Sequence, residues 1–241
     1  MNIDKLVLLL GFTTRSQAYI QALRHYDIQP KFVILYGDEK HPIAPTKRNI
    51  QPIFRSELFS PDLMESLLTS IKSIKVPYTH ITCKDLENKQ LLDTLSQLEP
   101  ALILFSGYGG QVVPDVMLRT ANKMLHIHSG RLPEYRGSTT IYYSILNENL
   151  CAVSAILLDT IIDTGPIVAR KEYSIPPPGT DVDYLFDNTI RADLLVDVLK
   201  SYAKNESFSD LSKQSPTNNS YYIIHPVLKH LALLKVDQNV K

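Results

Sequence analysis

The chain has 241 residues, 44% of them hydrophobic, and its 25 Lys and Arg residues balance its 25 Asp and Glu residues. This length and composition allow a sizeable buried core, so we expect a globular domain that needs no disulfide bonds for stability. A net charge of zero excludes a broad positive field that would attract nucleic acid or an anionic membrane by charge alone.

Short apolar runs alternate with amphipathic stretches over the first part of the chain. We expect strands at 6–12, 31–37, 78–83, 101–107 and 123–129, and helices at 16–26, 61–74, 89–98, 114–121 and 138–146. The helix at 61–74 would have Pro61 in its first turn, where proline is tolerated. Strands that alternate with helices predict a Rossmann-like α/β fold, in which right-handed crossovers connect a mostly parallel sheet.

The pattern changes after residue 150. It then predicts two strands around a loop, at 151–159 and 165–175, and a long helix at 182–204. A polar linker at 205–220 and a last apolar helix at 221–234 follow. We therefore expect an α/β domain over residues 1–205, followed over residues 206–241 by a linker and a short, docked C-terminal helix.

Three features of the sequence favour a cytoplasmic protein. The N-terminal stretch MNIDKLVLLLGFTT lacks the basic start and the cleavage site of a signal peptide. No apolar stretch is long enough to cross a membrane as a helix. Cys83 and Cys151 lack the spacing of metal ligands and indicate reduced packing residues.

Two strand ends of the expected sheet continue into loops suited to ligand binding, because ligands of parallel sheets bind where the strands end. One is FSGYGGQVVP, residues 105–114, in which Gly107, Gly109 and Gly110 let the main chain approach a flat ligand. This loop lacks the pattern and the lysine of a phosphate-binding loop. Taken alone, the glycine cluster is explained equally well by an ordinary turn.

The other strand end is HIHSGRLPEYRGSTTIY, residues 126–142. In an extended strand His126 and His128 project to the same side, about 7 Å apart, and both can act on one ligand. The two residues alone leave three interpretations open. They are polar strand-end residues bonded to neighbours, ligands of zinc, iron or manganese together with a later carboxylate, or an acyl-transfer pair. In the last case one histidine handles a proton and the other stabilises an oxyanion.

Two further segments follow the histidines in order, LPEYRG at 132–137 and DTGPI at 163–167. With them the chain resembles the folate-dependent formyltransferases, the family of methionyl-tRNA formyltransferase, glycinamide ribonucleotide transformylase and the sugar N-formyltransferases. That family has Asn-x-His at a strand end, then a Leu-Pro-x-Tyr/Phe-Arg/Lys-Gly turn and later an Asp-x-Gly-x-Ile/Val segment. His128 matches the family histidine, SGYGGQVVP resembles the folate-side loop, and the resemblance covers residues 100–175.

The resemblance implies a fold of the formyltransferase type, with residues 1–205 as the catalytic domain and formyl-tetrahydrofolate as the co-substrate. His128 would face the formyl carbonyl. Asp163 would orient His128 and accept protons from the acceptor amine, and no bound metal is implied. Seven residues would bind the cofactor: Gly107, Tyr108, Gly109, Gln111, Leu158, Asp159 and Ile161.

The chain departs from the family at His126, which stands where the family has asparagine. In the family this asparagine donates a hydrogen bond to the formyl oxygen, and a histidine can donate through a ring N–H. We therefore favour a working enzyme in which His126, His128 and Asp163 are catalytic. The alternatives are a changed acyl group or acceptor, binding without catalysis, and a metal-dependent hydrolase with these three side chains as ligands.

The acceptor amine is inferred by elimination. The segment after the long helix has mixed charge and is shorter than the basic C-terminal domain of methionyl-tRNA formyltransferases, which disfavours tRNA. The stretch GFTTRSQA lacks the glycine-rich phosphate loop expected in the purine enzyme. We expect a nucleotide-linked amino sugar of surface-glycan biosynthesis, with Arg15 at a phosphate, Tyr221 stacked on the base, and no nucleic-acid or membrane partner. The sequence leaves both a monomer and a homodimer open.

Overall fold

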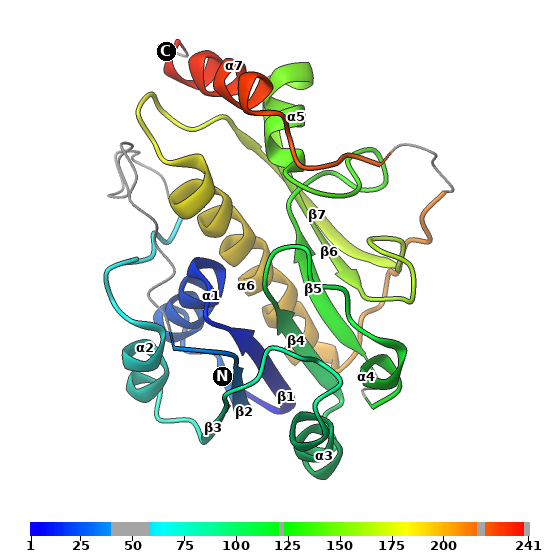
Figure 1. The fold of residues 1–241 in the computed structure, drawn as a ribbon. Coiled ribbons are helices and arrows are strands. Elements are labelled where there is room, and N and C mark those ends of the chain that lie inside the picture. Colours follow the sequence, from blue (N-terminus) through cyan, green and yellow to red (C-terminus); the bar gives the residue numbers. More distant parts are fainter. Residues whose placement is uncertain (40–57, 121–122, 216–219, 239–241) are drawn as a thin grey trace.

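The structure, a computed structural model, describes residues 1–39, 58–120, 123–215 and 220–238. These residues form a seven-stranded sheet with the order β3-β2-β1-β4-β5-β6-β7, in which β1 to β5 run parallel and β6 and β7 pair antiparallel (Figure 1). The strands are β1 (Asn2–Gly11), β2 (Gln29–Tyr36), β3 (Tyr78–Ile81), β4 (Leu102–Ser106), β5 (Met124–His128), β6 (Leu150–Leu157) and β7 (Ile167–Ser174). The predicted Rossmann-like, mostly parallel sheet is confirmed.

Helices cover both faces of this sheet. They are α1 (Thr14–His25), α2 (Leu67–Ser73), α3 (Lys89–Leu98), α4 (Asp115–Thr120), α5 (Thr140–Glu148), α6 (Asp187–Asn205), which a π-helical turn η1 (Val182–Phe186) precedes, and α7 (Pro226–Asp237). α1 and α6 bury one face, with Leu8, Leu104 and Ile127, whereas α3 and α4 bury the other, with Leu9 and Phe105. Strands buried on both faces explain why their sequences are almost continuously apolar.

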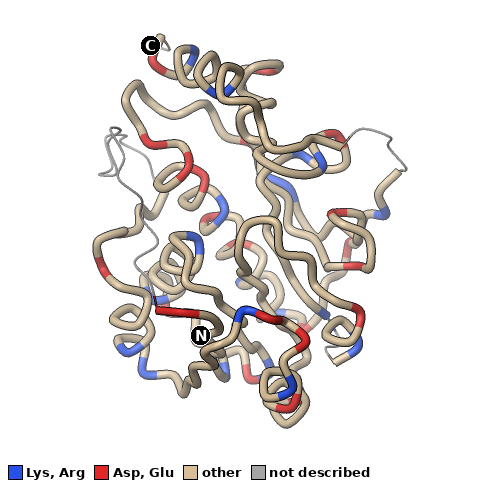
Figure 2. Tube along the Cα trace, viewed as in Figure 1, with Lys and Arg blue, Asp and Glu red and all other residues tan. Residues whose placement is uncertain are grey.

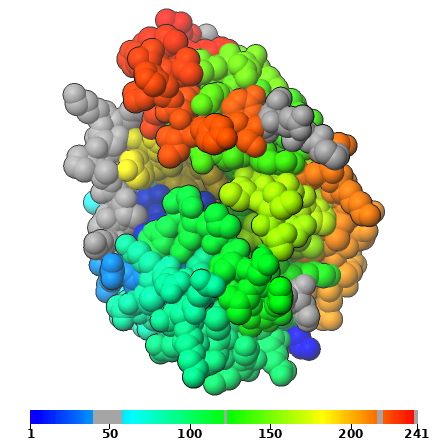
Figure 3. Space-filling model, turned by 45° about the vertical axis from the view of Figure 1, so that its right-hand side comes forward, coloured from blue at the N-terminus to red at the C-terminus, as the bar shows by residue number. Residues whose placement is uncertain are grey.

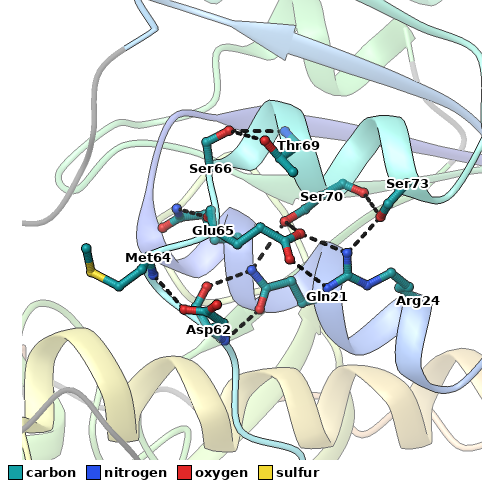
Figure 4. Close-up of polar contacts among 10 residues, drawn as sticks. Gln21, Arg24, Asp62, Met64, Glu65, Ser66, Thr69, Ser70 and Ser73 are labelled. Carbon is teal, nitrogen blue, oxygen red and sulfur yellow. Dashed lines mark hydrogen bonds and ion pairs between the residues drawn. The ribbon is translucent and has the colours of Figure 1, made fainter.

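The helix predicted at 61–74 is wrong for residues 61–66, because α2 begins only at Leu67, after the N-cap Ser66. The preceding chain is held by α1 instead. Gln21 binds the backbone of Asp62 in both directions, with Nε2 2.8 Å from the carbonyl oxygen and Oε1 2.7 Å from the amide nitrogen (Figure 4). These tertiary hydrogen bonds stabilise a turn at residues 62–65 where the local sequence favours a helix.

The C-terminal part contains the long α6 and a final helix, α7, which begins at Pro226 and not at residue 221 as predicted, and residues 216–219 of the predicted linker lie outside the described residues. α7 lies along α5 at the top of Figure 1, and Lys235 Nζ donates to the Leu146 carbonyl of α5 at 3.1 Å. Residue 121, the last of the helix predicted at 114–121, lies outside the described residues. None of the helices in the described ranges is long and apolar enough to cross a membrane.

Candidate active site

A pocket opens at the carboxyl ends of β4 and β5, beside the point where the strand order crosses over. β1 pairs with β2 on one side and with β4 on the other, so the carboxyl ends of β1 and β4 form the crossover point at which α/β sheets bind ligands. Two loops border the pocket, the β4–α4 loop (107–114) and the β6–β7 loop (158–166), and they flank a hollow in Figure 3. The lining residues are Phe105, Gln111, Val112, Val113, His126, Leu158, Asp159, Ile161, Ile162 and Asp163.

Two glycines explain how the LPEYRG turn and the DTGPI segment meet. A side chain at Gly165 would overlap the carbonyl of Leu157, so only glycine lets the β6–β7 loop fold back onto β6. Gly137 has φ +109° and would meet the backbone of Tyr221 with any side chain. The amide of Gly137 then donates to Asp163 Oδ2 at 3.2 Å, which joins the two segments.

His128 and Asp163 form a buried pair. His128 Nδ1 lies 3.4 Å from Asp163 Oδ2, and the two side chains are 6% and 11% exposed. The other ring nitrogen, Nε2, is 2.7 Å from the carbonyl oxygen of Tyr135, which can only accept, so Nε2 carries a proton. Burial lowers the pKa of His128, and the Asp163 carboxylate opposes this effect. The ring therefore gains its second proton at Nδ1, the atom that faces Asp163.

His126 differs from His128 because its ring lines the pocket. Its Nδ1 lies 3.3 Å from the carbonyl oxygen of Phe105, so in the neutral ring Nδ1 carries the proton and Nε2 keeps a lone pair. Burial, and after it the positive charges of Arg15 and Arg191, hold the pKa of His126 well below its usual value. The pocket is thus bordered by a neutral imidazole of β5 and by the Asp163 carboxylate of the β6–β7 loop.

An ion pair on α6 holds the strand that carries the histidines. Arg191 Nη1 donates to the Ile127 carbonyl at 2.8 Å, and Arg191 Nε donates to Asp187 Oδ2 at 2.8 Å. Asp187 also accepts a hydrogen bond from the Ser129 hydroxyl. These contacts were not predicted from the sequence, although the spacing of Asp187 and Arg191 places both on one face of the long helix.

The sequence profile of the formyl transferase family matches residues 4–193. The chain belongs to this family. Methionyl-tRNA formyltransferase from Chloroflexus aurantiacus is 38% identical over 125 residues, which is 50% of this chain and 40% of that protein. The chain thus spans about half the length, or less, of such curated relatives.

Solved formyltransferase structures share the fold. Glycinamide ribonucleotide transformylase 1 from Symbiobacterium toebii superposes with a TM-score of 0.60 at 14% identity, covering 88% of this chain and 95% of that one. A sugar N-formyltransferase from a Shewanella species gives a TM-score of 0.56 at 15% identity, covering 97% and 88%. The formyltransferase resemblance that LPEYRG and DTGPI indicated is confirmed at the level of family and fold.

Four of the seven residues expected to bind the cofactor line the pocket, namely Gln111, Leu158, Asp159 and Ile161. Tyr108 points elsewhere, since its hydroxyl donates to the carbonyl of Tyr36 at 3.2 Å and its ring packs on the ring of Tyr36. The carbonyl of Gly107 accepts a hydrogen bond from Arg15, and Gly109 faces open space. Three apolar side chains that also line the pocket were not predicted from the sequence, namely Val112, Val113 and Ile162.

The two residues expected at the acceptor lie apart from the pocket lining. Arg15 is tied to the end of β4, where Nε donates to Ser106 Oγ at 3.1 Å and Nη2 donates to the Gly107 carbonyl. Tyr221 stacks on Tyr135 of the LPEYRG turn, with ring centroids 5.3 Å apart and an interplanar angle of 19°. Arg15 therefore acts on the pocket through its charge, whereas Tyr221 covers the turn that binds His128.

In the described part of the chain, no three His, Cys, Asp or Glu side chains are grouped as metal ligands. The nitrogen positions explain this result for the two histidines. His126 directs Nδ1 at a carbonyl oxygen, and His128 directs Nε2 at another. One nitrogen of each ring is thus bonded to a backbone carbonyl, the other nitrogen of His128 faces Asp163, and Asp163 binds the amide of Gly137.

Proposed function

We propose that the chain is an N-formyltransferase that moves a formyl group from formyl-tetrahydrofolate to the amine of a small acceptor. The observation that carries this proposal is a single pocket lined by His126, by Asp163 and by side chains of both loops on the folate side. Ile161, Ile162 and Val112 are 65%, 55% and 54% exposed at this pocket, which suits them to cover a flat aromatic ring.

The reaction needs two proton acceptors. The acceptor arrives as an ammonium ion, loses one proton and attacks the formyl carbon, so that the carbonyl oxygen becomes negative. The amine nitrogen then loses a second proton, the bond between the formyl carbon and the folate nitrogen breaks, and that nitrogen gains a proton. We assign the first proton to the pair of Asp163 and His128, whose Nδ1 faces the carboxylate.

We assign the second proton to Nε2 of His126. A neutral ring with its proton on Nδ1 accepts at Nε2, and the charges of Arg15 and Arg191 favour that neutral form. Once protonated, Nε2–H can donate to the developing oxyanion or deliver the proton to the folate nitrogen. In this chain the histidine would replace the family's fixed amide donor with a group that first accepts a proton and then donates it.

A nucleotide-linked amino sugar remains the proposed acceptor. Lys and Arg are interspersed with Asp and Glu along the drawn chain in Figure 2, which favours a small acceptor over a polyanion. The likeness to the Shewanella sugar N-formyltransferase extends over 97% of this chain. The identity with methionyl-tRNA formyltransferases favours methionyl-tRNA as the second candidate.

The test is direct incubation of the purified protein with formyl-tetrahydrofolate and each candidate amine. The panel contains nucleotide amino sugars, methionyl-tRNA and glycinamide ribonucleotide, and the readouts are release of tetrahydrofolate and the mass of the product. Amine-dependent release with a product heavier by one formyl group supports the proposal, and the Asp163→Asn variant should lack it. Folate binding without turnover of any amine contradicts it.

A further inference from the structure

The C-terminal segment touches the site loop just before Gln214. Ser212 pairs with Ile167 through two backbone hydrogen bonds of 2.9 Å, directly after the β6–β7 loop. Gln214 Nε2 then donates to the carbonyl oxygens of Asp163 and Gly165, each at 2.8 Å. A primary amide has two N–H donors, so this one side chain supplies both hydrogen bonds.

The backbone that Gln214 holds is in an unfavourable conformation. Asp163 has φ +54°, a left-handed value that a non-glycine residue adopts only where its surroundings impose it. The two carbonyl oxygens held by Gln214 lie on either side of Thr164, at the end of the turn that Thr164 closes with Ile161. The orientation of this turn decides where the Asp163 carboxylate points.

The C-terminal part of the chain also contacts the turn whose amide binds the Asp163 carboxylate. Tyr221 accepts a hydrogen bond from Ser138 at 2.8 Å and donates one to the carbonyl of Arg136 at 2.7 Å. These two bonds enclose Gly137, whose amide donates to Asp163 Oδ2. The C-terminal segment thus holds both the turn that carries the carboxylate and the amide that binds it.

We infer that Gln214 is a positioning residue, which holds the Asp163 carboxylate against His128 although it does not line the pocket. Its effect on the rate rests on the proposed function. Its effect on His128 is independent of the proposed function, because the contact between His128 Nδ1 and Asp163 Oδ2 is made in the protein without substrate. Two readouts therefore separate the failure of this inference from the failure of the proposed function.

The first readout is kinetic. Gln214→Met keeps the length of the side chain and removes its hydrogen bonds. We expect kcat to fall roughly tenfold to a hundredfold, the usual effect of misplacing a reacting group by about 1 Å, with the KM for formyl-tetrahydrofolate nearly unchanged. Lys213→Ala is the matched control, since Lys213 is the exposed neighbour in the same segment, and it should leave both constants unchanged.

The second readout is the NMR titration of His128 in protein labelled at histidine, without any substrate. Four charged or titratable groups act on this ring: Asp163 of the β6–β7 loop, Arg191 and Asp187 of α6, and His126 of β5. Only the contact of Asp163 depends on Gln214. Because the carboxylate raises the pKa of His128, its displacement in Gln214→Met should move the His128 titration to lower pH than in the wild type.

Gln214→Leu provides a second neutral variant of similar size that cannot donate to the two carbonyl oxygens, and it should reproduce both effects. A lower His128 titration in both variants supports the inference even if no amine in the panel is formylated. Unchanged kcat and unchanged titration in either folded variant would overturn it. Lower thermal stability with both readouts unchanged would also overturn it, because it would show that Gln214 only stabilises the loop.

Discussion

His128 and Asp163 are held at 3.4 Å between Nδ1 and Oδ2, while the opposite nitrogen of the ring donates to the Tyr135 carbonyl. This arrangement fixes the tautomer of the histidine and leaves one atom for proton exchange with the carboxylate. It also places His128 behind Asp163, because Asp163 lines the pocket and His128 does not. The histidine is therefore expected to act on the acceptor amine through the carboxylate.

Asp163→Asn removes the charge and keeps the size of the side chain, including an oxygen for the Gly137 amide. Turnover should fall by about a hundredfold or more, because an amide accepts no proton. The KM for formyl-tetrahydrofolate should change little. Steady-state kinetics at saturating amine measures both, and full activity in the folded variant would remove Asp163 from the proton path.

His128→Asn tests the buried half of the pair. We expect kcat to fall by about a hundredfold or more, as for a lost acid–base group. Folate binding should be kept, because the ring does not line the pocket. Turnover assays and titration with a folate analogue, monitored by fluorescence, check the two statements. A loss of folate affinity equal to the loss of turnover would contradict this placement of His128.

The motifs predicted the site because their glycines encode the contacts that assemble it. Gly137 and Gly165 occur where the backbone of another segment leaves no room for a side chain. Gly165 lies two residues after Asp163 in DTGPI, and the amide of Gly137 in LPEYRG donates to the Asp163 carboxylate. The resemblance to the formyltransferases implied that His128 and Asp163 act together, and the structure has His128 Nδ1 3.4 Å from Asp163 Oδ2.

The contacts made by the two glutamines could not be predicted, because they join segments far apart in the sequence. Gln214 reaches Asp163 across 51 residues, and Gln21 reaches Asp62 across 41 residues. A glutamine in a polar stretch carries no local signal of its partner. The same limit explains why Arg15 was placed at a phosphate, whereas it binds the main chain at the end of β4.

The pair of Arg191 and Asp187 should contribute to stability. The side chains are 12% and 15% exposed, and Arg191→Met leaves the Asp187 carboxylate partly buried without its cation. We expect the free energy of unfolding to fall by about 3–5 kcal/mol, the usual cost of breaking a buried ion pair from one side. Lys204→Met, an exposed change on the same helix, is the control in denaturant unfolding.

Removal of metal separates formyl transfer from a metal-dependent hydrolase. Protein purified without an affinity tag should contain well under one equivalent of metal by elemental analysis. Treatment with a chelator should leave turnover intact, because each ring has one nitrogen bonded to a carbonyl oxygen and the other nitrogen of His128 faces Asp163. Stoichiometric zinc or iron that is lost in His126→Ala would contradict the transferase assignment.

The pH dependence of turnover tests His126, which stands where the family has asparagine. If Nε2 accepts a proton, the ring must be neutral, so the rate should fall as the pH drops through the pKa of His126. That pKa lies well below the usual histidine range, and the rate should therefore stay flat near neutral pH. A rate that instead falls as the pH rises through the histidine range would show that an imidazolium N–H is the active form.

Two substitutions complete this test. His126→Asn restores the amide donor of the family and should keep substantial activity, but without the acidic limb that belongs to His126. His126→Ala offers neither an acceptor nor a donor and should raise the barrier by about 3 kcal/mol, the usual loss for one oxyanion donor. If folded Asn and Ala variants are equally inactive, the site needs a proton acceptor that no amide can replace. If both keep full activity, His126 takes no part, and the second proton must go to the pair of Asp163 and His128.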